Sequence, residues 1–216
     1  MKSFNIHTVD TAPPASKELL KGVKKKIGFI PNVFANIAES PEALDGFVAL
    51  NGAFGASSLS PEEQQIVMLA TSTENNCVYC VAGHTTFAHQ IHMAEKTIEA
   101  MRNMNPLEDE KLQALNNIVR QMVRHRGRVS EEGIRNFLVV GYTRQQFFEV
   151  VIGVCLKTFS NYVSIGLQLT LDDEFKAYAW EGKDSREAAH SNKNTTTPLM
   201  KFKVRKIDAI NETVYP

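Results

Sequence analysis

The sequence contains few cysteines and no signal for export or membrane insertion. Three cysteines in 216 residues are too few for the disulfide framework of a small secreted protein. No apolar run approaches the roughly 20 residues of a membrane-spanning helix, and residues 1–7 lack the apolar segment of a signal peptide. We therefore expect a cytoplasmic protein with reduced thiols and no membrane contact.

The chain also lacks an excess of charge of either sign. Lys plus Arg and Asp plus Glu both number 24, so the formal net charge is zero. Such a chain has no bulk field that would attract nucleic acid, and we expect no nucleic-acid partner. Apolar residues make up 43% and charged residues 22%, which is typical of a globular protein with one well-buried core.

Strand patterns are nearly absent, and only residues 201–205 alternate with period two. Helix signals recur instead. The Ser-Pro pairs at 40–41 and 60–61 predict helix starts, because serine caps an N-terminus and proline fits the first turn. We predict an all-α fold with helices over residues 17–26, 33–39, 41–55, 62–74, 77–92, 94–103, 108–125, 131–141 and 145–169.

The composition predicts one domain with an extension at each end. Residues 1–180 form the predicted domain, and residues 1–24 are its N-terminal arm, with little order expected before residue 17 because of Pro13 and Pro14. After Trp180 the sequence shifts to polar and small residues. Residues 181–216 are therefore predicted to be a tail that is flexible or docks on a partner.

The most informative motif is Cys77-Val-Tyr-Cys80-Val-Ala-Gly-His84. Spacings of three and four residues place both thiols and the imidazole on one helix face. Thiols at this spacing can form a disulfide, and a nearby imidazole can take a thiol proton. Asn75 and Asn76 interrupt the preceding helix, so Cys77 is expected near a helix N-terminus, which favours a thiolate. The motif predicts redox chemistry.

Other interpretations of these residues stay open. Zinc could use the two cysteines and His84, with His89 or His92 as a further ligand, but no second CxxC or HxxxH is present. We expect the side chains of His89 and His92 to lie on the solvated surface. Tyr79 serves either packing or proton relay, and Cys155 is predicted to be buried among apolar neighbours.

Several segments resemble the AhpD-like alkylhydroperoxidases of the carboxymuconolactone decarboxylase superfamily. Residues 60–72 and 75–84 resemble the active-site helix pair of that family, while residues 28–34 and 149–162 are similar to its peroxidase-related members. The resemblance covers roughly residues 25–180. It implies an AhpD-like helical bundle and assembly as a trimer or hexamer.

The resemblance also implies roles for the motif. Cys80 is expected to attack the peroxide, Cys77 to close the disulfide, and His84 to serve in a proton relay. The relay glutamate of the family corresponds to Gln65 here, which cannot titrate. Glu74 is the first candidate for a replacement carboxylate and Glu62 is the second, although both are equally well explained as solvated charges at helix ends.

These expectations describe a thiol-dependent peroxidase that reduces hydrogen peroxide or organic hydroperoxides. It would need an external dithiol protein as reductant, but no cofactor or metal. Two alternatives remain. A decarboxylase acting on a γ-carboxymuconolactone-like substrate is disfavoured because that branch of the superfamily does not use the cysteine pair. A redox-sensing or zinc-stabilised scaffold would need no catalysis.

Overall fold

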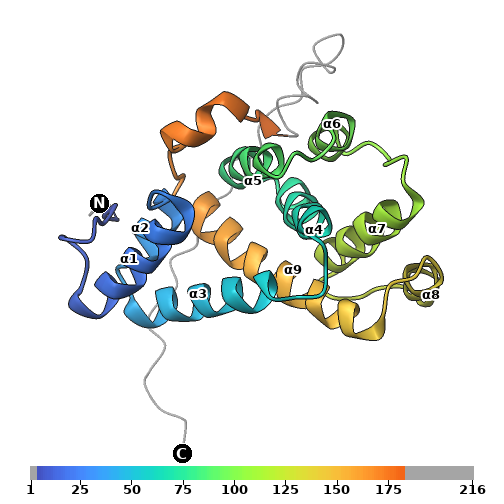
Figure 1. Ribbon diagram of the computed structural model, residues 1–216, viewed down its shortest axis with the longest axis horizontal. Helices are drawn as coiled ribbons and strands as arrows, with labels where there is room; N and C mark the ends of the chain where they lie inside the picture. The colour runs from blue at the N-terminus through green and yellow to red at the C-terminus, as the bar shows by residue number, and fades with distance from the viewer. Residues whose placement is uncertain (1–3, 183–216) are drawn as a thin grey trace, which may run out of the picture.

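The computed structural model describes residues 4–182, and this part of the chain is helical without a strand. The all-α expectation is confirmed. The alternating segment at 201–205 and nearly all of the predicted 181–216 tail lie outside the described residues. Figure 1 shows the helices in order: α1 (Pro14–Ile27), α2 (Asn32–Ile37), α3 (Pro41–Gly55), α4 (Pro61–Glu74), α5 (Val78–Gln90), α6 (Glu95–Asn103), α7 (Glu110–Arg124), α8 (Glu131–Val139), α9 (Arg144–Gly166) and the 3-10 helix η1 (Asp173–Tyr178).

The helix starts follow the capping signals of the sequence. The Ser60 hydroxyl accepts a hydrogen bond from the Glu63 amide, and the Glu63 carboxylate accepts one from the Ser60 amide, which forms a capping box. Ser40 caps α3 in the simpler way, accepting from the Ala43 amide. These bonds join residues that are close in sequence, so the starts of α3 and α4 follow from local sequence.

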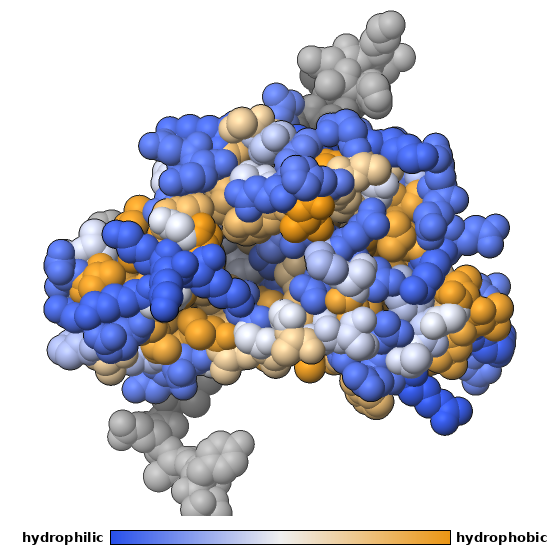
Figure 2. Space-filling model, viewed as in Figure 1, coloured by the Kyte–Doolittle hydropathy of each residue, from blue (hydrophilic) through white to orange (hydrophobic). Residues whose placement is uncertain are grey.

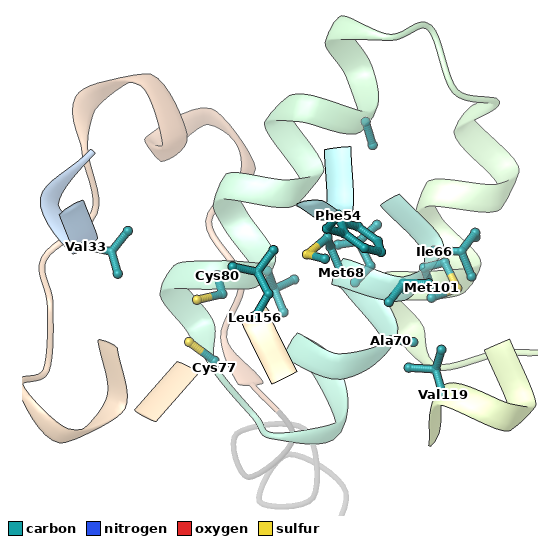
Figure 3. Packing of buried hydrophobic residues seen from close by; sticks show 14 of the residues in the cluster. Val33, Phe54, Ile66, Met68, Ala70, Cys77, Cys80, Met101, Val119 and Leu156 are labelled. Atoms are coloured by element: carbon teal, nitrogen blue, oxygen red, sulfur yellow. The ribbon is translucent and has the colours of Figure 1, made fainter. Parts of the chain in front are cut away.

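Helix α4 lies in the middle of the molecule and packs against α5, α6, α7 and α9 (Figure 1). It has no solvent-facing side along its second half, because every residue from 66 to 73 is buried. Figure 3 shows this core, with Ile66 and Met101 on one side of Phe54 and the two cysteines on the other. Figure 2 shows a mainly hydrophilic surface in the same view, with hydrophobic areas over α1 and α8.

Helix α9 has an unusual distribution of polarity. Its buried side carries polar residues, and Cys155 lies exposed on its outer side. The prediction that Cys155 is buried was therefore wrong, because apolar residues surround it in sequence on both faces of the helix. By length and composition α9 is the one helix within residues 4–182 that would suit a membrane span. Its buried side packs in the protein core against α3, α4 and α5.

Both ends of the described chain pack more tightly than the sequence predicted. Helix α1 begins at Pro14 and buries Leu20 and Val23 against the core, so residues 14–24 are not a loose arm. Helix η1 was not predicted. It lies against α5, where Phe175 is buried, and the Trp180 indole donates to the Arg102 carbonyl at 3.1 Å.

Candidate active site

Helix α5 positions the two cysteines at its first turn. Asn76 takes a left-handed conformation (φ 55°), which asparagine tolerates better than most residues, and so turns the chain from α4 into α5. Cys77 is the N-cap of α5, and its amide donates to the Ser72 carbonyl at 2.9 Å. Cys80 follows one turn later. Both side chains are buried and both thiols are free.

The two thiols are hydrogen-bonded to each other, and Figure 3 shows their sulfur atoms side by side. Cys80 also lines a cavity of about 90 Å³. Lys157 of α9 and His84 of α5 line the same cavity, together with Tyr79. The rest of its wall is mainly apolar, with the side chains of Ile27, Pro31, Val33, Phe34, Phe47, Phe87 and Phe175. The cavity can therefore hold a small, mainly apolar molecule beside the Cys80 sulfur.

A chain of hydrogen bonds crosses the site from α9 to α4. The Lys157 ammonium lies 2.7 Å from Nε2 of His84, and Nδ1 of His84 lies 2.9 Å from Oε1 of Gln65. An ammonium only donates, so Nε2 accepts and Nδ1 carries the proton that is donated to Gln65. Burial, together with the charge of Lys157, holds the pKa of His84 well below its usual value. The imidazole is therefore neutral at pH 7.

The surroundings of the two thiols stabilise negative charge on Cys80. Burial alone would raise the pKa of Cys80, but the hydrogen bond from Cys77 and the charge of Lys157 outweigh it. Weaker bonds from Ser164, 3.6 Å away, and Asn161 act in the same direction. The pKa of Cys80 is lowered to about 5. The hydrogen bond to Cys80, followed by burial, raises the pKa of Cys77, which stays protonated.

Lys157 is the residue of the candidate site that sequence analysis missed. It is buried on the inner side of α9, where it faces His84 and the Cys80 cavity. A signal was present in the sequence, because Lys157 is the only charged residue between Glu149 and Asp172. A lone lysine in such a position is either excluded to the surface or held inside by a specific partner.

The structure contradicts the expectation that Glu74 orients His84. Both ring nitrogens of His84 are occupied by Gln65 and Lys157. The two carboxylate oxygens of Glu74 instead pair with arginines of α7, at 3.0 Å from Arg120 and 2.7 Å from Arg124. The sequence placed Glu74 next to the motif, but the turn between α4 and α5 points it at α7.

The second candidate, Glu62, lies in the first turn of α4 and lines a separate hollow between α6 and the start of α7. That hollow contains no cysteine. The only group that the structure places at the imidazole from α4 is Gln65 itself, the residue at the position of the family glutamate. An amide therefore stands where the resemblance implies a carboxylate.

Tyr79 is a positioning residue rather than a proton carrier. Its hydroxyl donates to Asp172 at 2.5 Å and accepts from the Val33 amide at 3.3 Å. Burial, strengthened by the hydrogen bond to Asp172, raises its pKa, so the phenol keeps its proton. Asp172 in turn accepts from the Asn32 amide at 3.0 Å. Tyr79 thus ties α2 and the segment before η1 to the motif.

The remaining histidines of the region do not join the site. His89 stacks on Tyr178 with ring centroids 4.2 Å apart, and its Nδ1 lies 3.6 Å from Glu95. His92 follows α5 with a positive φ of 58°. Over residues 4–182, no three side chains of the metal-ligating types come together in a way that could hold a metal ion.

Comparisons with known proteins agree with this architecture. Residues 41–119, which span α3 to most of α7, match the model of the Carboxymuconolactone decarboxylase family. The match includes the cysteine pair and His84. A comparison with curated proteins found no match.

Solved structures share the fold at low sequence identity. An uncharacterised peroxidase-related protein of Ralstonia eutropha JMP134, described as an alkylhydroperoxidase AhpD core, superposes with a TM-score of 0.72 at 20% identity, over 83% of this chain and 97% of that one. A peroxidase-related protein of Silicibacter sp. TM1040 gives 0.67 at 19% identity, over 81% and 96%.

The debrominase Bmp8, in complex with 2,3,4-tribromopyrrole, gives a TM-score of 0.71 at 14% identity, over 82% of this chain and 95% of that one. Proteins described as peroxidase-related and a debrominase therefore share this fold. Residues 41–119 therefore resemble the Carboxymuconolactone decarboxylase family, and the chain as a whole shares the fold of these solved structures. The fold is the helical fold of the AhpD core structure.

Proposed function

We propose that this protein is a thiol-dependent peroxidase that reduces hydrogen peroxide or a small organic hydroperoxide. The observation that carries the proposal is the unequal environment of the two cysteines. Cys80 lines the cavity beside the charge of Lys157. Cys77 does not line the cavity and donates a hydrogen bond to the Cys80 sulfur. A thiolate next to a protonated thiol is the arrangement that peroxide reduction through a disulfide requires.

The proposed cycle has three steps. The Cys80 thiolate attacks the terminal peroxide oxygen, the O–O bond breaks, and the alkoxide leaves and takes up a proton while Cys80 becomes a sulfenic acid. The Cys77 sulfur then attacks the Cys80 sulfur, which forms the disulfide and releases water. An external dithiol protein supplies the two electrons that return both cysteines to thiols.

Lys157 and His84 serve the first step. The Lys157 ammonium stabilises the attacking thiolate, and it lies at the cavity where charge develops on the leaving oxygen. A proton that the ammonium donates to the leaving alkoxide leaves a neutral amine, which regains a proton from solvent before the next cycle. The hydrogen bond to Nε2 of the neutral His84 holds Lys157 at the cavity. Gln65 fixes the imidazole tautomer without titrating.

The cavity sets the class of peroxide. Its volume of about 90 Å³ and its aromatic and aliphatic wall suit hydrogen peroxide or a compact alkyl hydroperoxide better than a long-chain one. Reductive removal of halogen from a small aromatic ring is a second candidate, because the aromatic wall faces the same thiolate. It would use the same two electrons and the same disulfide.

One experiment separates these activities. The purified protein, reduced beforehand with a small dithiol that is then removed, is given one equivalent of either peroxide or a brominated pyrrole, and peroxide loss and bromide release are both measured. We expect peroxide loss with a Cys77–Cys80 disulfide, found by mass spectrometry as the loss of two hydrogens. A Cys155→Ser variant should behave identically, since Cys155 is exposed on the other side of α9. Bromide release without peroxide loss would favour the second candidate. The absence of both reactions would contradict both candidates.

A further inference from the structure

The outer side of α9 is an exposed apolar surface. Half of the ten large hydrophobic side chains that are exposed within residues 4–182 lie on this one helix. The only charged residue between Glu149 and the end of α9 is Lys157, which is buried on the opposite side. Four helical turns therefore present no charge to solvent. We define the α9 stripe as the five side chains Phe148, Val151, Cys155, Phe159 and Tyr162.

The α9 stripe has a symmetric pattern. Its members are spaced 3, 4, 4 and 3 residues apart, with Cys155 in the middle. In an antiparallel pair with a two-fold axis at Cys155, Phe148 meets Tyr162 of the second copy and Val151 meets Phe159. The mean spacing of 3.5 residues also keeps the stripe on one side of the helix when two helices wind around each other.

We propose that the α9 stripe is an interface between two copies of this chain, related by a two-fold axis at Cys155. Phe148 and Tyr162 are 68% and 69% exposed, and Val151 and Phe159 are each 36% exposed. With roughly 200 Å² for a full aromatic side chain, the stripe and Ile165 offer about 500 Å² per copy. A pair would bury about 1,000 Å², which is about the least area of a specific interface.

Charge placement supports the same antiparallel arrangement. Arg144 is the first residue of α9 and is exposed, although a cation at a helix N-terminus is unfavourable. The symmetry that pairs Phe148 with Tyr162 places Arg144 beside Gly166 at the C-terminus of the α9 helix of the second copy. A cation is favourable there, because the last carbonyls of that helix carry partial negative charge.

The assembly state of the full chain tests the proposal. Sedimentation or light scattering at micromolar concentration should give a mass of two copies or an even multiple of two. Phe148→Glu and Tyr162→Lys should each halve the mass. The double variant should recover it, because the new carboxylate and ammonium face each other twice across the axis. Val139→Glu on α8, at an 84% exposed position, is the control and should change nothing.

Cys155 provides a second readout in the same protein. Facing helices 8–10 Å apart bring the opposed Cα atoms to about 4–6 Å, a separation that a disulfide spans. Copper-phenanthroline, which removes the two electrons and two protons, should link two copies covalently. The link should be lost in Cys155→Ser and in Phe148→Glu.

Three results would overturn the proposal. The first is a monomeric mass without cross-linking, which is also the result if residues 183–216 cover the α9 stripe. The second is an assembly that keeps its mass in both single variants, which would place the interface elsewhere. The third is a double variant that stays dissociated, which would reject the two-fold pairing.

Discussion

At the scale of single residues, the site depends on one buried cation. Lys157 contributes a positive charge to the Cys80 cavity and a hydrogen bond to His84. Replacing Lys157 by Met should raise the pKa of Cys80 above its value of about 5, because the thiolate loses its nearest cation. The acid limb of the pH–rate profile should then move to higher pH, and the rate at pH 7 should fall at least 10-fold.

The measurement is thiolate absorbance near 240 nm against pH, alongside the pH–rate profile. Lys176→Met on η1 is the matched control, since Lys176 is exposed and pairs with Asp173. An unchanged thiol titration in Lys157→Met would show that Lys157 does not activate Cys80.

The Gln65→Glu substitution tests the effect of a carboxylate at the position of the family glutamate. In Gln65→Glu the new carboxylate should accept the hydrogen bond from Nδ1 of His84, and its negative charge should raise the pKa of the imidazole. The same charge should raise the pKa of Cys80 and partly neutralise Lys157. We therefore expect a pH–rate profile displaced to higher pH, with Gln64→Glu as the neighbouring control. Identical profiles for the two variants would mean that His84 is not coupled to the thiolate.

Glu74 should matter for stability rather than for chemistry. In Glu74→Gln the buried Arg120 loses its ion-pair partner, and breaking such a pair destabilises a protein by about 3 kcal/mol. Urea unfolding should detect this loss, while the pH–rate profile stays that of the wild type. Glu62→Gln, at the other end of α4, should change neither property. A displaced pH profile in Glu74→Gln would restore the relay role that the sequence suggested.

At the scale of secondary-structure elements, α9 approaches α3 and α4 closely because residue 153 is glycine. A Cβ atom there would lie 2.4 Å from Phe54 and 2.8 Å from Val67, inside the packed core. Gly153→Ala should therefore destabilise the protein by about 1–3 kcal/mol, through overpacking.

Thermal or urea unfolding measures this effect. Gly46→Ala in α3 is the matched control, because nothing lies within 4 Å of the new methyl group. That variant should be neutral or slightly more stable, as alanine is the better helix former. Equal stability of the two variants would contradict the close packing of α9.

The elements also show what sequence alone could predict. The starts of α3 and α4 follow from local capping by Ser40 and Ser60, and the structure confirms both. Helix η1 was missed because its position depends on contacts distant in sequence, such as the bond from Tyr79 to Asp172. The buried side of α9 was misjudged because apolar residues occur on all sides of it, which hides the orientation of Cys155.

At the scale of the whole molecule, the candidate site combines three helices that are far apart in sequence. The cysteine pair and His84 form one local motif on α5, and the sequence was sufficient to find it. Gln65 and Lys157 come from α4 and α9, and only the packing of these helices around α5 brings them to the imidazole. A local pattern can identify the candidate thiols and imidazole, but it cannot show which distant charge lies beside them.

The central claim is that Cys80 attacks the peroxide and Cys77 resolves the product. The most direct test is mass spectrometry of the Cys77→Ser and Cys80→Ser proteins after one equivalent of peroxide in the presence of dimedone. The account predicts one dimedone adduct, on Cys80, in Cys77→Ser, and none on Cys77 in Cys80→Ser. An adduct on Cys77 in Cys80→Ser, with none on Cys80 in Cys77→Ser, would contradict it.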